Sequence, residues 1–325
     1  MSPGPVNPPA PKPRPTRARD WIPDQPGAWV MALAPAVAGF VAGGPTRDSV
    51  WLVALWALCY CVQFAAARWL KSRFARRYLM PVAAYGVALV VLGVPFVVID
   101  SGILRWAPIY MVLAALSFLA AWLRRERSLW GNAVAVLASS LMATVVASYG
   151  SRNMSDASCV LEVARYDAQG NPMPVPCGTQ QMLAIMHEPP TWDTWWSPYA
   201  FPAGGLMMSA VFAATQFGSV LFVKTMIRER GSRAYLVASV AWHAVLFAGV
   251  TWWIGSFVPA GGVEDGWIPM PLMWTELAAI WLLARSVALP WIGSRRRVKP
   301  VVTGMVEMVS TLLVFVAVLT ALAAA

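Results

Sequence analysis

The residues of this chain that are best suited to chemistry are charged side chains at the ends of, or inside, long apolar stretches. The densest set lies in FVKTMIRERGSR, residues 222–233, and consists of Lys224, Arg228, Glu229, Arg230 and Arg233. Guanidinium and ammonium groups that converge at the end of an apolar helix bind phosphate well, and they also anchor a helix at a membrane surface. The pattern therefore predicts either a site for an anionic headgroup or a diphosphate, or a membrane anchor, and leaves both open.

Three more charged residues, Glu276, Arg285 and Glu307, lie within apolar segments. A charge at membrane depth is costly unless it is paired, protonated or hydrated, so such a side chain normally faces the interior of a helix bundle. Glu276 and Arg285 are more than two helical turns apart, so each needs a partner on another helix. We predict either a polar cavity lined by these three residues and Gln216, or a structural polar network made of the same residues.

The sequence contains none of the catalytic signatures that we searched for, namely a glycine-rich phosphate loop, a nucleophile elbow, HExxH, paired CxxC or an aspartate-rich metal motif. His243 lies in an apolar stretch, where a single histidine is either a haem or proton-relay ligand or a hydrogen-bonded packing residue. His187 lacks the companions of a four-ligand metal site. We therefore expect no cofactor and no metal, and we favour a protein that is not an enzyme.

The elements that must position these residues are membrane-spanning helices. The chain has 325 residues, of which 58% are hydrophobic and 12% charged, and this leaves too little polar surface to cover a soluble protein of that size. Apolar runs of about 20 residues, long enough to cross a bilayer as a helix, recur along the chain. We predict an all-α membrane protein with about nine spans, at residues 28–44, 49–70, 79–98, 103–123, 129–149, 199–223, 234–257, 268–290 and 301–323.

The basic residues predict how this bundle is oriented. With nine spans and the N-terminus inside, only four of the 25 lysines and arginines fall on the outer side: Arg47, Arg105, Arg152 and Arg165. Cytoplasmic loops are enriched in basic residues, so we expect the N-terminus inside, the C-terminus outside and the protein in a bacterial plasma membrane. The same rule explains the net charge of +10 without nucleic acid.

The expected domain organisation is simple. Residues 1–20 are rich in proline and arginine and are expected to form a disordered cytoplasmic tail, whereas residues 21–325 form a single transmembrane domain. A long loop, residues 150–198, falls on the outer side and contains Cys159 and Cys177. Two cysteines on an oxidising face, in a loop too small to build its own core, predict a disulfide. The lipid bilayer is the partner that these features predict, and they identify no protein partner.

Four segments resemble the YwiC-like family of bacterial membrane proteins. They are WIPDQPGAWVMALAPAVAG, FVKTMIRERGSRAYLVASVAWH, WTELAAIWLLARSVALP and KPVVTGMVEMVSTLLVF, at residues 21–39, 222–243, 274–290 and 299–315. The first segment departs from the family pattern, because Pro26 stands where the family usually has histidine. The resemblance implies a multi-pass membrane protein of unassigned activity.

The predicted topology is also similar, more distantly, to UbiA-type prenyltransferases, and this similarity implies a UbiA-like bundle. Those enzymes bind magnesium diphosphate through aspartate motifs after helices two and six. Here the first motif is replaced by Gln63, Phe64, Ala67 and Lys71, and the second by Lys224, Arg228 and Glu229. Because the aspartates are absent, the sequence does not support metal-dependent prenyl transfer.

Three functional hypotheses follow from these observations. The first is a protein that binds an anionic lipid or isoprenoid-type ligand at a cytoplasmic-facing polar cavity. This hypothesis is based on the basic cluster near Glu307. The second is a proton-coupled transporter or permease, based on Glu276 and Glu307 as proton-binding sites and on Pro35 and Pro202 as helix breaks. The third is a membrane assembly factor in which the buried acids are structural.

Overall fold

The structure is a computed structural model, and it describes most of the membrane domain. The described residues are 21–23, 26–156, 165–166, 172–173, 184–257, 270–296 and 298–323. The predicted tail at 1–20 and the predicted disulfide between Cys159 and Cys177 lie outside them.

The described residues form helices almost throughout, and the all-α prediction is confirmed. The first half contains α2 (Pro26–Gly43), α3 (Arg47–Lys71), the 3-10 turn η1 (Arg76–Tyr78), α4 (Leu79–Ile99), the 3-10 turn η2 (Ser101–Trp106), α5 (Ala107–Trp122) and α6 (Leu129–Ser148). The second half contains α10 (Ala203–Val223), the π-helical turn η3 (Lys224–Arg228), α11 (Arg233–Phe257), α12 (Met270–Arg295) and α13 (Pro300–Ala323). Between them, the connecting segment contains α7 (Ser151–Asp156), the antiparallel two-residue strands β1 (Arg165–Tyr166) and β2 (Pro172–Met173), and α9 (Trp192–Trp195).

Eight helices among the described residues are long and apolar enough to cross a membrane. The predicted first span is a shorter apolar helix, α2, which has 18 residues and contains Pro35. The nine predicted spans thus correspond to eight candidate membrane-spanning helices and α2. The chain is a multi-pass membrane protein; the predicted orientation of its termini stays a prediction.

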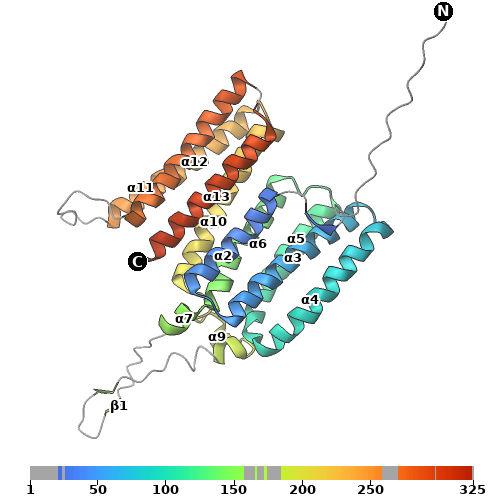
Figure 1. The fold of residues 1–325 in the computed structure, drawn as a ribbon, viewed down its shortest axis with the longest axis vertical. Coiled ribbons are helices and arrows are strands. Elements are labelled where there is room, and N and C mark those ends of the chain that lie inside the picture. Colours follow the sequence, from blue (N-terminus) through green and yellow to red (C-terminus); the bar gives the residue numbers. More distant parts are fainter. Residues whose placement is uncertain are drawn as a thin grey trace, which may run out of the picture.

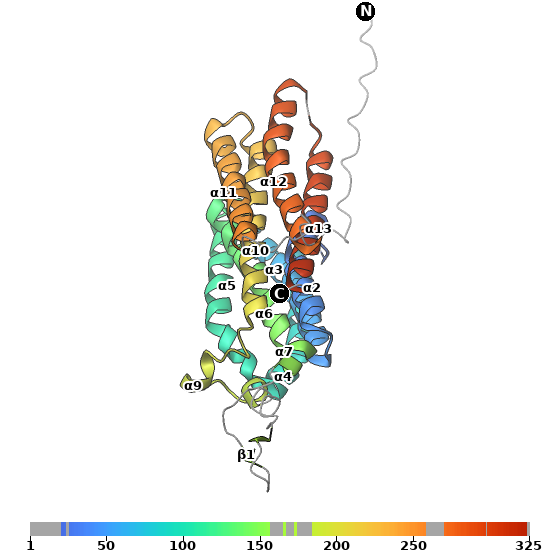
Figure 2. The ribbon, with the colours of Figure 1, turned by 90° about the vertical axis from the view of Figure 1, so that its left-hand side faces the viewer.

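The helices form one elongated bundle with α2, α6 and α10 at its centre (Figure 1). α3, α4 and α5 pack on one side of these three helices, and α11, α12 and α13 pack on the other. α6 contacts both α2 and α10, and it is the most buried of the eight candidate spans. The side view shows these helices running roughly parallel to the long axis, with α9 and β1 at one end (Figure 2).

Small residues bring the central helices into close contact. A Cβ atom added at Gly39 of α2 would lie 2.3 Å from the backbone oxygen of Ala143 in α6, and one added at Gly43 would lie 2.9 Å from Cα of Ala147. Such distances leave no room for any side chain, so backbones touch as they do at small-residue contacts between membrane helices. This contact fixes α2 against α6.

One end of the bundle, called here the basic end, gathers the basic loops around residues 71–78, 123–128, 224–233 and 293–299. Lys71 forms an ion pair with Glu126. Nζ of Lys224 donates to the carbonyl oxygen of Arg127 at 2.8 Å, and Nη2 of Arg230 donates to that of Gly293 at 2.5 Å. These contacts place basic loops that are far apart in the sequence side by side.

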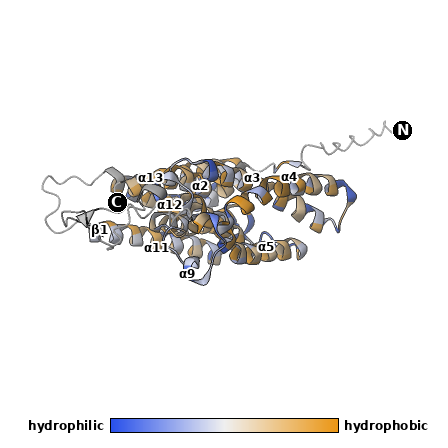
Figure 3. Cartoon of the chain, turned by 90° about the horizontal axis from the view of Figure 1, so that it is seen from below, coloured by the Kyte–Doolittle hydropathy of each residue, from blue (hydrophilic) through white to orange (hydrophobic). Residues whose placement is uncertain are grey.

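The opposite end, called here the loop end, holds the short α2–α3 and α4–α5 connections and the described parts of the connecting segment. Thr46 caps α3 by accepting from the backbone N–H of Ser49, and its hydroxyl also donates to the carbonyl oxygen of Tyr149 at 2.6 Å. Away from both ends, α4 and α5 present mainly hydrophobic residues, drawn in orange in Figure 3. α4 is the least buried of the candidate spans, as expected for a helix that faces lipid.

Candidate functional site

The stretch 222–233 leaves α10 through an irregular turn. The N–H of Glu229 donates to the carbonyl oxygen of Lys224 at 2.7 Å, five residues back, so the helix widens into the π-helical turn η3. Gly231 then adopts a φ of +87°, a conformation that glycine reaches without the steric cost of a Cβ. Ser232 follows, and its carbonyl accepts the first helical bond of α11 from Leu236. The sharp turn places the first residues of α11 beside the end of α10.

A cavity of about 330 Å³ lies at this turn, between η3, α11 and α12. Arg230 and Arg233 contribute positive charge to its wall. The other lining residues are the hydroxyl-bearing Thr225, Ser232 and Ser294, the glycines Gly231 and Gly293, and the apolar Met226, Leu236 and Pro290. The cavity therefore combines two guanidinium groups and three hydroxyl groups with an apolar wall.

The other basic residues of the stretch are placed differently. Lys224 is buried and is held by the carbonyl oxygen of Arg127, and its Nζ lies 5.5 Å from the centroid of the Tyr235 ring. Arg228 is exposed and Glu229 is half-buried, and neither lines the cavity. The predicted cluster is thus divided: Arg230 and Arg233 share the cavity, whereas Lys224 ties η3 to the loop before α6.

Deeper in the second half, Arg285 and Glu307 form an ion pair between α12 and α13. Arg285 also donates to the hydroxyl of Ser219 on α10 at 3.0 Å, and its guanidinium carbon lies 4.7 Å from the ring centroid of Phe222. The Arg285 side chain is 1% exposed and that of Glu307 is 16% exposed. The positive charge is therefore matched by one carboxylate, one hydroxyl and one aromatic face.

Gln216 lies near this pair but bonds elsewhere. Its amide nitrogen donates to the carbonyl oxygen of Met31 in α2, and its amide oxygen accepts from Ser139 in α6. Gln216 and Ser219 line a small cavity of about 10 Å³, roughly the space that one water molecule occupies. The predicted grouping is thus divided: Gln216 bonds to α2 and α6, Arg285 and Glu307 pair with each other, and Ser219 both bonds to Arg285 and lines the small cavity.

Glu276 and His243 lie apart from the ion pair. Thr251 of α11 donates to Oε1 of Glu276 at 3.0 Å, so this acid also finds its partner on another helix. His243 is fully buried, with Nδ1 2.7 Å from the carbonyl oxygen of Ser239 and Nε2 against Gly218 of α10. Among the described residues, no group of three or more histidine, cysteine, aspartate or glutamate side chains is arranged to hold a metal ion.

At the loop end, Arg105 fastens the connecting segment to the α4–α5 corner. Its side chain is buried in the corner and donates to the carbonyl oxygen of Gly102 at 2.9 Å. It also donates to three carbonyl oxygens of the connecting segment, those of Ile185, Thr194 and Trp195, at 2.8, 2.8 and 3.2 Å. The sequence marks Arg105 only as one of the few basic residues expected on the outer side, because backbone acceptors carry no signal in the sequence.

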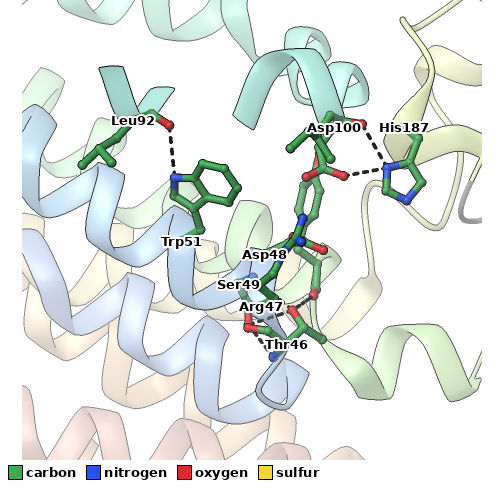
Figure 4. A network of polar contacts seen from close by, with 10 residues as sticks. Thr46, Arg47, Asp48, Ser49, Trp51, Leu92, Asp100 and His187 are labelled. Atoms are coloured by element: carbon green, nitrogen blue, oxygen red, sulfur yellow. Dashed lines mark hydrogen bonds and ion pairs between the residues drawn. The ribbon is translucent and has the colours of Figure 1, made fainter. Parts of the chain in front are cut away.

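Beside Arg105, Asp100 and His187 meet across the same junction (Figure 4). Nδ1 of His187 lies 2.8 Å from Oδ1 of Asp100 and 3.0 Å from the carbonyl oxygen of Ile99. The Asp100 side chain is 1% exposed, whereas that of His187 is 44% exposed. Burial raises the pKa of Asp100 and the charge of Asp48 raises it further, against the opposing effects of His187 and Arg47. Sequence reasoning missed this pair, because 87 residues separate its members.

Comparison with known proteins finds a family similarity in the first half of the chain. Residues 22–147 match the family described as YwiC-like protein. A relative from Haemophilus influenzae, named "Uncharacterized protein", is 23% identical over 228 residues, which make up 68% of this chain and 74% of the relative. No solved structure matches the chain. The match covers nearly all of the first of the four segments that resemble the family and the helices from α2 to α6, and over these residues the chain is similar to YwiC-like proteins.

Proposed function

We propose that this YwiC-like membrane protein binds an anionic phosphate-bearing lipid, either an anionic phospholipid or an isoprenoid phosphate, in the cavity between η3, α11 and α12. The observation that carries the proposal is the wall of that cavity, where Arg230 and Arg233 stand among three hydroxyl groups. Guanidinium groups present their donors in a fixed fork that fits phosphate oxygens.

The backbone at the cavity adds to this positive character. Gly231, Ser232 and Arg233 all line it, and Arg233 begins the 25-residue helix α11. The first N–H groups of a helix have no partner within the helix and favour negative charge. Arg230 uses one nitrogen on the carbonyl oxygen of Gly293, and guanidinium has donors to spare for a ligand.

The apolar wall supports a lipid over a free phosphate. Met226, Leu236 and Pro290 line the cavity together with its polar groups. The residue after Leu236, Val237, is 65% exposed, as is typical of a helix surface in contact with acyl chains. A headgroup in the cavity therefore has an apolar path for its chain along α11. The positive-inside rule supports a location of this basic end on the cytoplasmic side of a bacterial plasma membrane.

Native mass spectrometry of the detergent-purified protein tests the proposal. Two probes are added in parallel, phosphatidic acid and a polyprenyl phosphate, with zwitterionic phosphatidylcholine as the reference lipid. We expect retention of an anionic probe over phosphatidylcholine, whose phosphate is neutralised by its choline group. Arg230→Gln with Arg233→Gln should weaken it by about tenfold or more, since each charge-assisted hydrogen bond contributes about 1.5–3 kcal/mol.

Arg228→Gln is the matched control, because it removes an arginine of the same turn that does not line the cavity. Arg233→Gln alone keeps the bond between Arg230 and Gly293, so it tests binding without disturbing that contact. Equal retention of phosphatidylcholine and both anionic probes would contradict the proposal. An Arg228→Gln variant as impaired as the double variant would reduce the basic cluster to a general membrane anchor.

A second candidate function, proton-coupled transport, is favoured by the ion pair of Arg285 and Glu307 beside the hydroxyl-lined cavity of about 10 Å³. Carboxylates inside membrane bundles mark proton pathways in transporters. Proteoliposomes with a trapped pH dye test this candidate under an imposed membrane potential. Proton flux that Glu307→Gln abolishes and Glu188→Gln leaves unchanged supports transport, and equal fluxes in protein-containing and empty vesicles exclude it.

A further inference from the structure

The junction between the α4–α5 corner and the connecting segment holds polar groups that neither candidate function uses. The carboxylate of Asp100 is buried, and apart from the contact with His187 its two oxygens have no hydrogen-bond partner. The hydroxyl of Tyr149, whose side chain is 2% exposed, also has none. Buried polar groups in folded proteins are nearly always satisfied, so two such residues at one junction require a chemical explanation.

We propose that Asp100 is a proton-binding site that exchanges protons with the surrounding water through His187. The geometry provides the connection, because the half-exposed imidazole contacts the fully buried carboxylate at 2.8 Å. Protonation also removes the cost of burying a carboxylate, since a carboxyl group is neutral and can donate a hydrogen bond.

The transfer is balanced in protons. A neutral His187 with its hydrogen on Nδ1 takes a proton from water at Nε2 and passes the Nδ1 proton to Oδ1 of Asp100. The carboxylate becomes a carboxyl group, and the imidazole is left neutral with its hydrogen on Nε2. Loss of the Nε2 proton to water, followed by uptake of one proton from water at Nδ1, returns the neutral ring to its starting tautomer, so the net change is one proton gained by Asp100 from water.

The charged and titratable groups around Asp100 raise or lower its pKa. α3 contributes Asp48 and Arg47, the connecting segment contributes His187, and the end of α6 contributes Tyr149, which also interacts with Arg105 of η2. Burial, followed by the charge of Asp48, raises the pKa of Asp100, while His187 and Arg47 lower it. Burial and the nearby Asp100 raise the pKa of Tyr149, which keeps its hydroxyl protonated as a donor.

The connecting segment keeps water from the site. Arg105 binds three of its carbonyl oxygens, and Ser101 donates to the carbonyl oxygen of His187 at 2.7 Å. Met186, next to His187, is 3% exposed, and a Cβ added at Gly102 would lie 2.2 Å from the carbonyl oxygen of Ile185. A segment held so closely leaves the imidazole as the contact between Asp100 and the surface.

Infrared titration of the protonated carboxyl band in the intact, detergent-solubilised protein tests the site. We expect a band that titrates with a midpoint above the ordinary pKa of 3.8 for aspartate and that Asp100→Asn removes. Asp48→Asn should lower the midpoint, because it removes a neighbouring negative charge, and His187→Gln should raise it. Glu188→Gln, which changes the exposed neighbour of His187, should leave the midpoint unchanged. Asp100→Glu should shift the band, which keeps the assignment testable if Asp100→Asn does not fold.

The rate of hydrogen–deuterium exchange at the same band tests the path. In His187→Gln we expect exchange to slow by about a hundredfold, the lower end of what a positioned acid–base side chain contributes. A midpoint at or below the ordinary value, or a band that persists unchanged in both Asp100 variants, would overturn the site. Exchange as fast in His187→Gln as in wild type would overturn the path through His187.

Discussion

Arg285 on α12 and Glu307 on α13 form an ion pair inside the second half of the membrane domain. Their pairing joins two helices at a depth where neither charge is stable alone. The same guanidinium reaches Ser219 on α10, so three helices meet at one positive charge. Of the four predictions that follow, the first concerns this pair.

Removal of one partner of this pair should be far more harmful than removal of both. Arg285→Met leaves the Glu307 carboxylate buried without its cation, and we expect a loss of about 3–5 kcal/mol in the free energy of unfolding. The double variant with Glu307→Met should recover most of this loss. Reversible unfolding in mixed micelles measures the free energy of unfolding of each variant. Arg295→Met, which changes an exposed arginine on the same helix, is the control. Equal stability of the single and double variants would contradict the expected cost of the unpaired Glu307 carboxylate.

The contact between α2 and α6 should not tolerate even one methyl group at Gly39. The added Cβ would lie 2.3 Å from the backbone oxygen of Ala143, and a backbone atom has little room to move. We expect Gly39→Ala to lower the free energy of unfolding by about 1–3 kcal/mol. Gly86→Ala is the matched control, because nothing lies within 4 Å of its added Cβ. Similar unfolding curves for the two variants would contradict the close approach.

Arg105 should determine whether the connecting segment stays docked. Arg105→Gln loses several of its bonds to carbonyl oxygens, and amide hydrogen exchange over residues 184–201 is expected to accelerate while the helices remain protected. Arg152→Gln is a suitable comparison, since this exposed arginine of the loop end donates to the carbonyl oxygen of Ala42 and lies outside the docked residues. Unchanged exchange in Arg105→Gln would mean that apolar contacts alone hold the segment.

Asp100 should make stability depend on pH in a defined direction. Its pKa is raised in the folded protein, so the folded state binds this proton more tightly than the unfolded chain does. The associated stability is fully present below the ordinary pKa of 3.8 and is lost as the pH rises through the raised value. Two proteins are compared by thermal unfolding, the His187→Gln variant and the same variant with Asp100→Asn, so that imidazole titration contributes to neither. The protein that keeps Asp100 should lose stability relative to the one with Asp100→Asn as the pH increases, and parallel curves would refute the prediction.

The helices were predictable because their signal is local. A run of about 20 apolar residues is sufficient to place a span, and the predicted span at 129–149 differs from α6 (Leu129–Ser148) by one residue. α2 is the instructive case, because its 18 residues include Pro35 and it lies in the centre of the bundle. Its length alone is marginal for a membrane span, and it is the packing against α6 that fixes its position within the bundle.

The candidate sites were predictable only in part, because their partners come from distant parts of the chain. The sequence shows that Glu276 and Arg285 each need a partner on another helix, but it does not choose between the available groups. Lys224 illustrates a second limit, since its acceptor is the backbone oxygen of Arg127 and every residue has such an oxygen. The π-helical turn, which sets where Arg230 points, has no periodic signature at all.

The position of α2 also has a consequence for the order in which the protein assembles. α2 packs against α6, α10 and α13, three helices that the ribosome produces later, and α13 follows it by the length of the whole membrane domain. Until α6 has been synthesised, the glycine face of α2 has no helix to cover it. The contact of α2 with α13 forms only after that helix has been inserted, and a nascent chain released before α13 would expose this second surface of α2 to chaperones and proteases of the membrane.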